Sequence, residues 1–297
     1  MKAKSQSKVE SGLVIVDKPA EWTSHDVVGK MRRLAGTRRV GHAGTLDPMA
    51  TGVLVVGVEK ATRLLGHLAL TEKGYDATIR LGQSTNTDDA EGELTGSASA
   101  AGVTQEALRA GVAKLTGLIQ QVPPQVSAIK VNGERAYKMA RKGEEVALAA
   151  RPVTVHGFEI TAVRREGELV DVDASISCSS GTYIRALARD LGADLGTGGH
   201  LTYLRRTRVG PYDLSMARTI DQLAEKVEVL PMAEAVAAVF PRREVDQDEA
   251  RKVMHGGRLP AAGLGPGPVG VFAPDGTLLA LVEEQDGTAK FLAVFVP

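Results

Sequence analysis

The stretch of the chain that decides the fold is RRVGHAGTLDPMATGVL, residues 38–54. Its glycine, proline and polar residues predict a loop over 37–51. The loop leads into GVLVVGV, residues 52–58, which has the length and the unbroken apolar character of a strand buried on both faces. Before the loop, apolar residues at helical spacing in 24–34 predict an amphipathic helix that begins at a serine or threonine cap. A helix, a glycine-rich loop and a buried strand therefore follow one another.

The rest of the chain alternates between short strands and helices. Period-two patterns predict strands over 13–16, 75–81, 152–164, 168–178 and 201–209, and helical patterns predict helices over 104–116, 183–195 and 220–238. Glu166-Gly167 separates two of these strands as a hairpin turn does. We therefore predict an α+β fold with a mixed, largely antiparallel sheet flanked by helices.

Changes in composition suggest three regions. Residues 1–11 are polar and partly basic, with no apolar segment of a targeting signal, and are predicted to be a disordered tail. Residues 12–240 have the size and the apolar content of a large catalytic domain. Beyond Phe240, glycines and prolines accumulate and short strands flank a Pro-Asp-Gly turn. We predict a small C-terminal β-rich domain over 241–297.

The overall charge and the cysteine count exclude several classes of protein. Lys and Arg number 36, as do Asp and Glu, so the formal net charge is zero. This balance argues against unspecific wrapping of nucleic acid, but it leaves room for a local basic groove. Cys178 is the only cysteine, so no intrachain disulfide can form, and the six histidines show no metal-binding spacing. No segment approaches the roughly 20 apolar residues of a membrane span. We expect a cytoplasmic monomer without a metal site.

Asp47 is the one carboxylate in the deciding stretch. The glycines around it permit close approach of the backbone to a ligand, and Pro48 stiffens the next position. Arg38, Arg39 and His42 add positive charge and an aromatic ring nearby. A loop of this kind beside a rigid strand is a common place for catalytic groups. On local chemistry alone, a turn-capping role for the Asp-Pro step is the simpler alternative.

Several motifs, in order along the chain, resemble those of the pseudouridine synthases, specifically the bacterial tRNA pseudouridine-55 synthase (TruB) family. The loop GHAGTLDPMATGVL resembles the signature of that family. The other motifs are DKP (17–19) followed by SHDVV, KGYDATIRLGQSTNTDDAEG (73–92), PPQVSAIKVNGERAYKMARKG (123–143), CSSGTYIRALARDLG (178–192) and HLTYLRRTRVG (200–210). The resemblance covers roughly 12–215, and its co-linear motifs make it specific.

The resemblance implies a role for several side chains. Asp47 matches the catalytic aspartate that attacks the target nucleoside, and Arg185 matches the arginine that pairs with it. Tyr75 matches an aromatic residue that packs against the target base, where its hydroxyl could assist proton removal. The implied substrate-binding residues also include His42, Tyr183 and Leu204, and Lys18 is expected to have a supporting structural role.

The implied reaction breaks the N1–C1′ bond of a uridine, turns the uracil and joins C5 to C1′. It involves no net oxidation or hydrolysis, so no cofactor and no metal is expected. The target base must be flipped out of its stack into a pocket. Burial raises the pKa of an aspartate, whereas a paired guanidinium keeps it ionised, which suits the implied role of Arg185. Three roles stay open for Asp47: attack on C6, attack on C1′, or removal of a sugar proton.

The expected partner is the T-arm stem-loop of tRNA, with uridine 55 of the T loop as the target. The residues expected to contact the RNA backbone are Arg38, Arg39, Arg141, Lys142, Arg205 and Arg206. Residues 123–150 resemble the mobile RNA-binding insertion of the family. Residues 241–297 are expected to correspond to a reduced PUA-like domain.

Three other functions compete with this interpretation. A non-catalytic RNA-binding or tRNA-folding factor on the same fold would not need Asp47 together with Arg185. A guide-RNA-dependent pseudouridine synthase would be expected to carry longer basic tails. A phosphate-binding enzyme would need a GxxxxGK[ST] motif, which the chain lacks, or a GxGxxG motif that joins a strand to a helix. The one GxGxxG match, GPGPVG at 265–270, lies in the proline-rich stretch before a short strand and does not fit that context.

Overall fold

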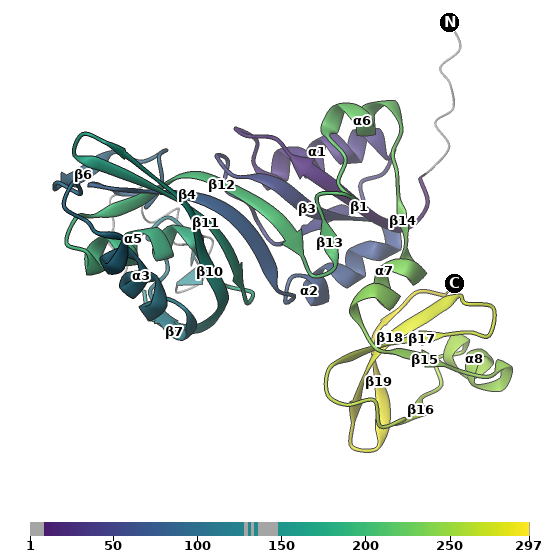
Figure 1. Cartoon of the computed structure of the whole chain (residues 1–297). Coiled ribbons are helices and arrows are strands. Elements are labelled where there is room, and N and C mark those ends of the chain that lie inside the picture. The colour runs from purple at the N-terminus through teal and green to yellow at the C-terminus, as the bar shows by residue number, and fades with distance from the viewer. Residues whose placement is uncertain (1–8, 128–129, 132–133, 136–147, 297) are drawn as a thin grey trace, which may run out of the picture. The chain divides into compact units, whose positions relative to one another are not determined.

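The computed structural model describes residues 9–127, 130–131, 134–135 and 148–296 of the chain. These residues form two compact units, which we call unit 1 and unit 2 (Figure 1). Unit 1 comprises the described residues of 1–48, 52–69 and 209–297, and unit 2 comprises those of 49–51 and 70–208. Both units consist of mainly antiparallel strands with helices packed against them, so the predicted α+β class is confirmed.

Unit 1 begins with the elements around the glycine-rich stretch. They are β1 (Gly12–Lys18), α1 (Ser24–Leu34), β2 (Val40–Ala43), β3 (Thr51–Val58), the 3-10 helix η1 (Glu59–Leu64) and α2 (Leu65–Leu68). Strand β3 pairs antiparallel with β1 along its length, from Lys18↔Gly52 to Gly12↔Val58. It is buried from its second residue onward, as its apolar sequence predicts.

Helix α1 begins at a capping box. The Thr23 side chain accepts a hydrogen bond from the Asp26 N–H, and the Asp26 carboxylate accepts one from the Thr23 N–H. The loop predicted over 37–51 is wrong in part, because β2 pairs antiparallel with β3 between Val40↔Val58 and Ala43↔Val55. Pairing with a distant strand supplies the hydrogen bonds that the local sequence does not suggest.

The second half of unit 1 contains β13 (Tyr212–Asp213), α6 (Ile220–Glu225), β14 (Leu230–Pro231) and α7 (Met232–Val239). The single helix predicted over 220–238 is therefore wrong. Lys226 is extended, Leu230 pairs with Leu13 of β1, and Pro231 has no N–H to donate within a helix. Two shorter helices replace the predicted one.

Residues 242–294 form a second sheet within unit 1. Its strands are β15 (Arg242–Glu244), β16 (Leu259–Pro260), β17 (Pro268–Phe272), β18 (Leu278–Gln285) and β19 (Thr288–Val294), with α8 (Gln247–Met254) packed beside them. The strand order is β15-β17-β18-β19-β16, with β15 parallel to β17 and the other pairs antiparallel. One cluster of buried side chains lies within this sheet and α8, and another joins Phe272 and Phe295 to Leu13 and Val55.

Unit 2 is built on a long hairpin. Its elements are β4 (Lys73–Leu81), β5 (Gln83–Thr85), β6 (Leu94–Ser97), α3 (Gln105–Lys114), β7 (Gly117–Gln121), β8 (Lys130–Val131), β9 (Glu134–Arg135), β10 (Arg151–Glu166), β11 (Leu169–Cys178), α5 (Ile184–Asp194) and β12 (Gly199–Val209). The strand order is β12-β4-β11-β10-β7, and the pairs from β4 to β7 are antiparallel. Helices α3 and α5 pack against this sheet and each other (Figure 1).

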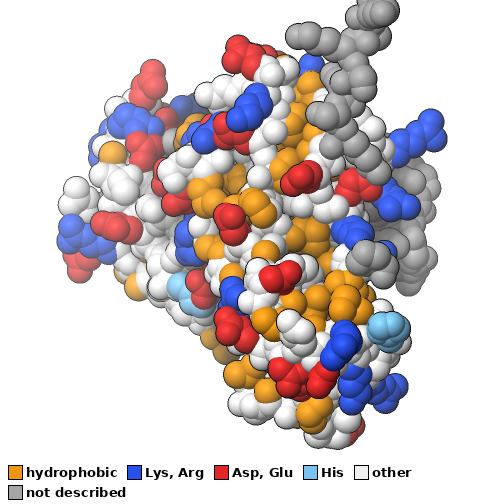
Figure 2. Space-filling model, turned by 90° about the vertical axis from the view of Figure 1, so that its right-hand side faces the viewer, with side chains coloured by type: hydrophobic (Ala, Val, Ile, Leu, Met, Phe, Trp, Pro, Cys, Tyr) orange, Lys and Arg blue, Asp and Glu red, His pale blue; other side chains and the backbone are white. Residues whose placement is uncertain are grey.

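No helix in the described part of the chain is both long and apolar enough to cross a membrane. On the face drawn in Figure 2, acidic and basic side chains are interspersed with apolar ones, in keeping with the zero net charge. A site for a polyanion therefore has to come from a local arrangement of basic side chains.

Candidate active site

The loop that carries Asp47 is held on both sides of the carboxylate. Before it, the Leu46 N–H donates to Ser24 Oγ at 2.9 Å, and Ser24 Oγ donates to the Leu46 carbonyl at 3.2 Å. After it, the Pro48 carbonyl accepts a hydrogen bond from Lys18 Nζ at 3.1 Å. Asp47 itself is half-buried. The backbone around the carboxylate is thus fixed by two side chains of unit 1.

Lys18 is fully buried, with 0% of its surface exposed, although it carries an ammonium group. Its Nζ also donates to the carbonyls of Pro19 at 2.8 Å and Trp22 at 2.6 Å. Three carbonyl oxygens therefore accept the three protons of the ammonium group, which satisfies the buried charge. This geometry gives the DKP motif a structural task, the tethering of the Asp47 loop to the end of β1.

His42 lies on β2 in the same unit and is half-buried. Its ring meets that of His25, at the start of α1, edge to face, with the centroids 5.7 Å apart. Two imidazoles thus lie together at the N-terminal end of α1.

Tyr75, Tyr183 and Leu204 belong to unit 2. Tyr75 is a buried residue of β4 opposite Ile176 of β11, and Leu204 is a buried residue of β12. Tyr183 is the N-cap of α5 and has no side-chain capping bond. Instead, the buried Gln121 amide binds its backbone twice, accepting from the Tyr183 N–H at 2.8 Å and donating to its carbonyl at 3.1 Å.

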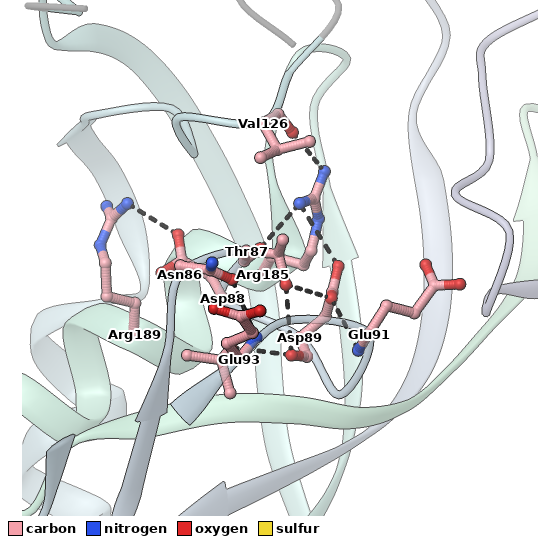
Figure 3. Close-up of polar contacts among 10 residues, drawn as sticks. Asn86, Thr87, Asp88, Asp89, Glu91, Glu93, Val126, Arg185 and Arg189 are labelled. Atoms are coloured by element: carbon pink, nitrogen blue, oxygen red, sulfur yellow. Dashed lines mark hydrogen bonds and ion pairs between the residues drawn. The ribbon is translucent and has the colours of Figure 1, made fainter. Parts of the chain in front are cut away.

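Arg185 lies in the first turn of α5, with its side chain 5% exposed. Its Nη1 is 3.3 Å from Asp89 Oδ2 and donates to the Thr87 carbonyl at 2.8 Å, and its Nη2 donates to the Val126 carbonyl at 3.0 Å (Figure 3). Asp89 is equally buried and accepts hydrogen bonds from Thr87 Oγ1 and the Glu91 N–H. A charged pair buried in this way is stable only because its remaining hydrogen-bonding groups are also satisfied.

A second pair lies one turn further along α5. Arg189 Nη1 is 3.1 Å from Asp88 Oδ2 (Figure 3), and its Nη2 donates to the Val122 carbonyl at 2.7 Å. Burial raises the pKa of Asp88, and this effect exceeds the opposing effect of the two arginines. Arg185 and Arg189 together attach residues 87–89 and 122–126 to the same face of one helix.

Sequence reasoning missed this network. The acidic, small-residue-rich segment that follows β4 has the composition of an exposed loop, yet Asp89 is buried. One signal was available in the sequence: the four-residue spacing of Arg185 and Arg189 places two cations on one helix face. In the structure these two cations meet the adjacent Asp88 and Asp89.

The residues expected to contact the RNA backbone lie in different environments. Arg38 and Arg39 are exposed, and Arg39 is 3.7 Å from Glu59. Arg205 is half-buried and donates to Thr51 Oγ1 at 3.3 Å. Arg206, in contrast, is only 1% exposed, so its guanidinium is not presented to an RNA surface, contrary to the expectation. Arg141 and Lys142 lie outside the described residues.

Two buried titratable groups, Lys73 of β4 and Cys178 of β11, lie opposite each other in the sheet of unit 2. Burial, followed by the charge of Arg206, lowers the pKa of Lys73 to about 8, and Lys73 Nζ donates to the Thr71 carbonyl at 2.7 Å. Burial raises the pKa of the Cys178 thiol to about 11. Within the described ranges, no group of three or more His, Cys, Asp or Glu side chains is arranged to hold a metal ion.

Comparison with known families gives matches along almost the whole chain. The family described as "TruB family pseudouridylate synthase (N terminal domain)" matches residues 32–184. "tRNA pseudouridylate synthase B C-terminal domain" matches residues 185–237, and "tRNA Pseudouridine synthase II, C terminal" matches residues 240–296.

Individual relatives and solved structures agree with these matches. A protein of Thermobifida fusca (strain YX) named tRNA pseudouridine synthase B is 66% identical, over 96% of this chain and 98% of the relative. A protein of the same name from Arthrobacter sp. (strain FB24) is 64% identical, over 97% of both chains. A chain from the crystal structure of a Cbf5-Nop10-Gar1 complex is similar with a TM-score of 0.71 and 28% identity, over 96% of this chain and 84% of that one. A chain from the structure of an H/ACA RNP bound to a substrate RNA containing 2′-deoxyuridine has a TM-score of 0.71 and 25% identity, over 96% of this chain and 85% of that one.

Proposed function

The chain belongs to the TruB family of pseudouridylate synthases, and on this premise we propose that it converts uridine 55 in the T loop of tRNA to pseudouridine. The observation that carries the proposal is the similarity, over almost the full length of both chains, to relatives named tRNA pseudouridine synthase B. The reaction is an isomerisation: the N1–C1′ bond breaks, the C5–C1′ bond forms, C5 loses its proton to solvent, and N1 gains a proton. We propose that the enzyme acts as a monomer in the cytoplasm.

In this proposal Asp47 is the catalytic carboxylate that attacks the target nucleoside. Two features of unit 1 support the role. The carboxylate is half-buried, which limits competition from water, and the backbone on either side of it is held by Ser24 and Lys18. A catalytic group must keep its position within a fraction of an ångström, and tethers of this kind provide that constraint.

Arg185 is proposed to keep the Asp47 carboxylate ionised and oriented. An arginine side chain keeps its positive charge in proteins and offers five N–H donors in a fixed plane. Asp89 and the carbonyls of Thr87 and Val126 fix that plane in unit 2. We propose that Asp89 is a positioning residue that acts on the reaction through Arg185.

The substrate base is proposed to leave its stack and enter a pocket lined by Tyr75, Tyr183 and Leu204. An aromatic ring such as that of Tyr75 gives a flipped base a stacking surface, worth about 1–3 kcal/mol per base. The double hydrogen bond between Gln121 and the Tyr183 backbone supports this site by fixing the start of α5. His42 is proposed to contact the flipped RNA segment, and Arg38, Arg39 and Arg205 to contact the backbone.

The test is tritium release from unmodified tRNA labelled at C5 of its uridines, with EDTA present. Formation of the C5–C1′ bond expels the label, so we expect release with the wild type and none with Asp47→Asn. Asp286→Asn is a matched control, because Asp286 is an exposed turn residue with a φ of 51°, a conformation that asparagine also adopts. The control should release tritium at the wild-type rate.

Binding of tRNA to the same proteins separates the two candidate functions. Asp47→Asn should bind tRNA nearly as well as the wild type, since the amide keeps the shape of the carboxylate. Binding without tritium release by the wild type would contradict the enzymatic proposal and favour the tRNA-folding factor. Release at a uridine other than uridine 55, mapped by sequencing, would contradict the target.

A further inference from the structure

A hollow of about 680 Å³ opens on unit 1 at the C-terminal end of α1. Its lining consists of Arg32, Arg33, Gly36, Thr37 and Arg38, and we call it the arginine hollow. Three arginines thus line one concavity, and none of the described residues that line it carries a carboxylate. In a chain of zero net charge this is a local concentration of positive charge.

The end of α1 explains why these arginines lie together. The Ala35 N–H donates to the Met31 carbonyl at 2.8 Å, and the Thr37 N–H donates to the Arg32 carbonyl at 3.2 Å, which closes the last turn. Gly36 between them has a φ of 65°, so the chain reverses there and returns toward the helix end. An added Cβ at Gly36 would meet nothing within 4 Å, so the hollow is open at this point.

One carboxylate, that of Glu59, lies beside the arginine hollow in the described structure. This carboxylate accepts a hydrogen bond from Thr37 Oγ1 of the lining at 2.6 Å and is paired with Arg39, at 3.7 Å, which is not part of the lining. Neither Arg33 nor Arg38 forms an ion pair with any described residue. The guanidinium groups of Arg33 and Arg38 are therefore available to an anion from outside.

Stabilisation of the helix end does not account for all three arginines. The C-terminus of a helix carries about half a negative charge, which favours basic residues in the last turn. Arg32 and Arg33 fall in that turn, but Arg38 lies beyond it. Three full positive charges against about half a negative one leave the hollow strongly positive.

We propose that the arginine hollow binds a phosphate group of the substrate RNA backbone, at a position apart from the target nucleotide. Guanidinium groups bind phosphate oxygens through paired N–H donors, and three arginines line this one hollow. This inference rests on the proposed function, because the RNA is the substrate named there. It adds Arg32 and Arg33 to the RNA-binding residues and gives Arg38 a specific site.

The experiment compares binding of unmodified full-length tRNA to two triple variants across a range of salt concentrations. The first carries Arg32→Ala, Arg33→Ala and Arg38→Ala. The matched control carries Arg165→Ala, Lys252→Ala and Lys290→Ala, which removes the same charge from scattered exposed positions. Asp47→Asn is the common background, so that the RNA is not converted during the measurement.

The first variant should bind tRNA about tenfold more weakly. Its plot of log affinity against log salt should be shallower by about 0.7–0.9 for each phosphate that the hollow no longer binds. The control should show a much smaller change in both quantities. With Asp47 restored, KM for tRNA should rise while kcat at saturation stays the same. Inorganic phosphate at constant ionic strength should compete with tRNA in the control and not in the first variant.

Because Arg32 also donates to the Val40 carbonyl, a second variant with only Arg33→Glu and Arg38→Glu guards against a folding defect. Equal binding and equal salt slopes for the hollow variants and the control would overturn the proposal. Binding of inorganic phosphate by the wild type, with tRNA binding unchanged in the hollow variants, would assign the hollow to free phosphate. That result would also overturn the proposal. Tritium release by the wild type in the same series shows separately whether the proposed function holds.

Discussion

The guanidinium of Arg185 and the carboxylate of Asp89 lie 3.3 Å apart, with 5% and 3% of their side chains exposed. The two residues come from α5 and from the loop after β5, and the contact attaches that loop to the helix (Figure 3). In such a pair each charge is tolerated because of the other, so the removal of one leaves the other buried and uncompensated.

Asp89→Asn should therefore lower both stability and turnover. We expect the free energy of unfolding in urea to fall by about 2–4 kcal/mol, because Arg185 loses its counter-charge in a buried position. We expect kcat for tritium release to fall as well, with KM for tRNA little changed, because Arg185 is no longer fixed in the orientation proposed for Asp47.

The matched control is Asp171→Asn in the same unit. Asp171 forms two hydrogen bonds of 2.8 Å with Arg80, but the side chains of this pair are 18% and 30% exposed. Solvent screens such a pair, so its removal should cost about 1 kcal/mol or less and leave kcat unchanged. A wild-type kcat for Asp89→Asn would contradict the positioning role, as would equal losses of stability in Asp89→Asn and Asp171→Asn.

Lys18→Met should uncouple the Asp47 loop from β1. Methionine fills a similar volume, but the three carbonyls of Pro19, Trp22 and Pro48 lose their common donor. We expect a loss of about 2–4 kcal/mol in the free energy of unfolding, and a fall in kcat because the Pro48 carbonyl is released next to Asp47. Thermal unfolding and tritium release measure the two effects.

Lys60→Met is the comparison for this substitution. Lys60 Nζ donates to a single carbonyl, that of Phe295, at 2.7 Å, and the side chain is only partly buried. It should lose no more than about 1 kcal/mol and keep its kcat. If Lys18→Met kept wild-type kcat, the tethering of the Asp47 loop would have no catalytic consequence.

The sequence predicts those parts of the molecule that depend on local pattern. The apolar run of β3, the Thr23 cap of α1 and the hairpin of β10 and β11 follow from composition and periodicity, and the structure confirms them. The candidate catalytic loop follows from its motif, whereas the roles of its residues stay predictions.

The parts that the sequence does not predict depend on distant partners. The burial of Asp89 depends on Arg185, which follows far along the chain, and strand β2 depends on pairing with β3. Arg206 is predicted from sequence to contact RNA together with Arg205, yet it is buried, because alternate residues of β12 point to opposite faces of a sheet. A local sequence pattern contains no information on which strand or helix will cover it.

Cys178 should be inert in the folded protein. Its side chain is fully buried, and burial raises the pKa of the thiol to about 11 from its ordinary value of 9.0. Because the thiolate is the reactive form, this shift alone lowers its population at neutral pH by about 100-fold. A disulfide reagent such as DTNB should label the unfolded protein in urea at once and the native protein at least 100-fold more slowly. Rapid labelling of native protein would contradict the burial.

Lys73 should make stability depend on pH in the alkaline range. Burial lowers the pKa of Lys73 in the folded protein to about 8, from the ordinary value of 10.5. Below pH 8 both states carry the proton, so the folded state bears the full cost of the buried charge. Between about pH 8 and 10.5 the unfolded chain binds more protons than the folded one. The free energy of unfolding therefore increases as the pH rises through this range.

Lys73→Met removes this cost, so it should stabilise the protein most at pH 7 and progressively less as the pH rises toward 10. The shift corresponds to about 3 kcal/mol at most, reduced by the absence of the hydrogen bond to the Thr71 carbonyl. The measurement is the difference in the free energy of urea unfolding between variant and wild type at pH 7 and 9.5. Cys178 is common to both proteins, so its own titration largely cancels.

Lys252→Met, at an exposed position, is the control and should change the free energy of unfolding by less than about 0.5 kcal/mol at either pH. A difference that stays constant with pH, or grows, would contradict the buried charge on Lys73.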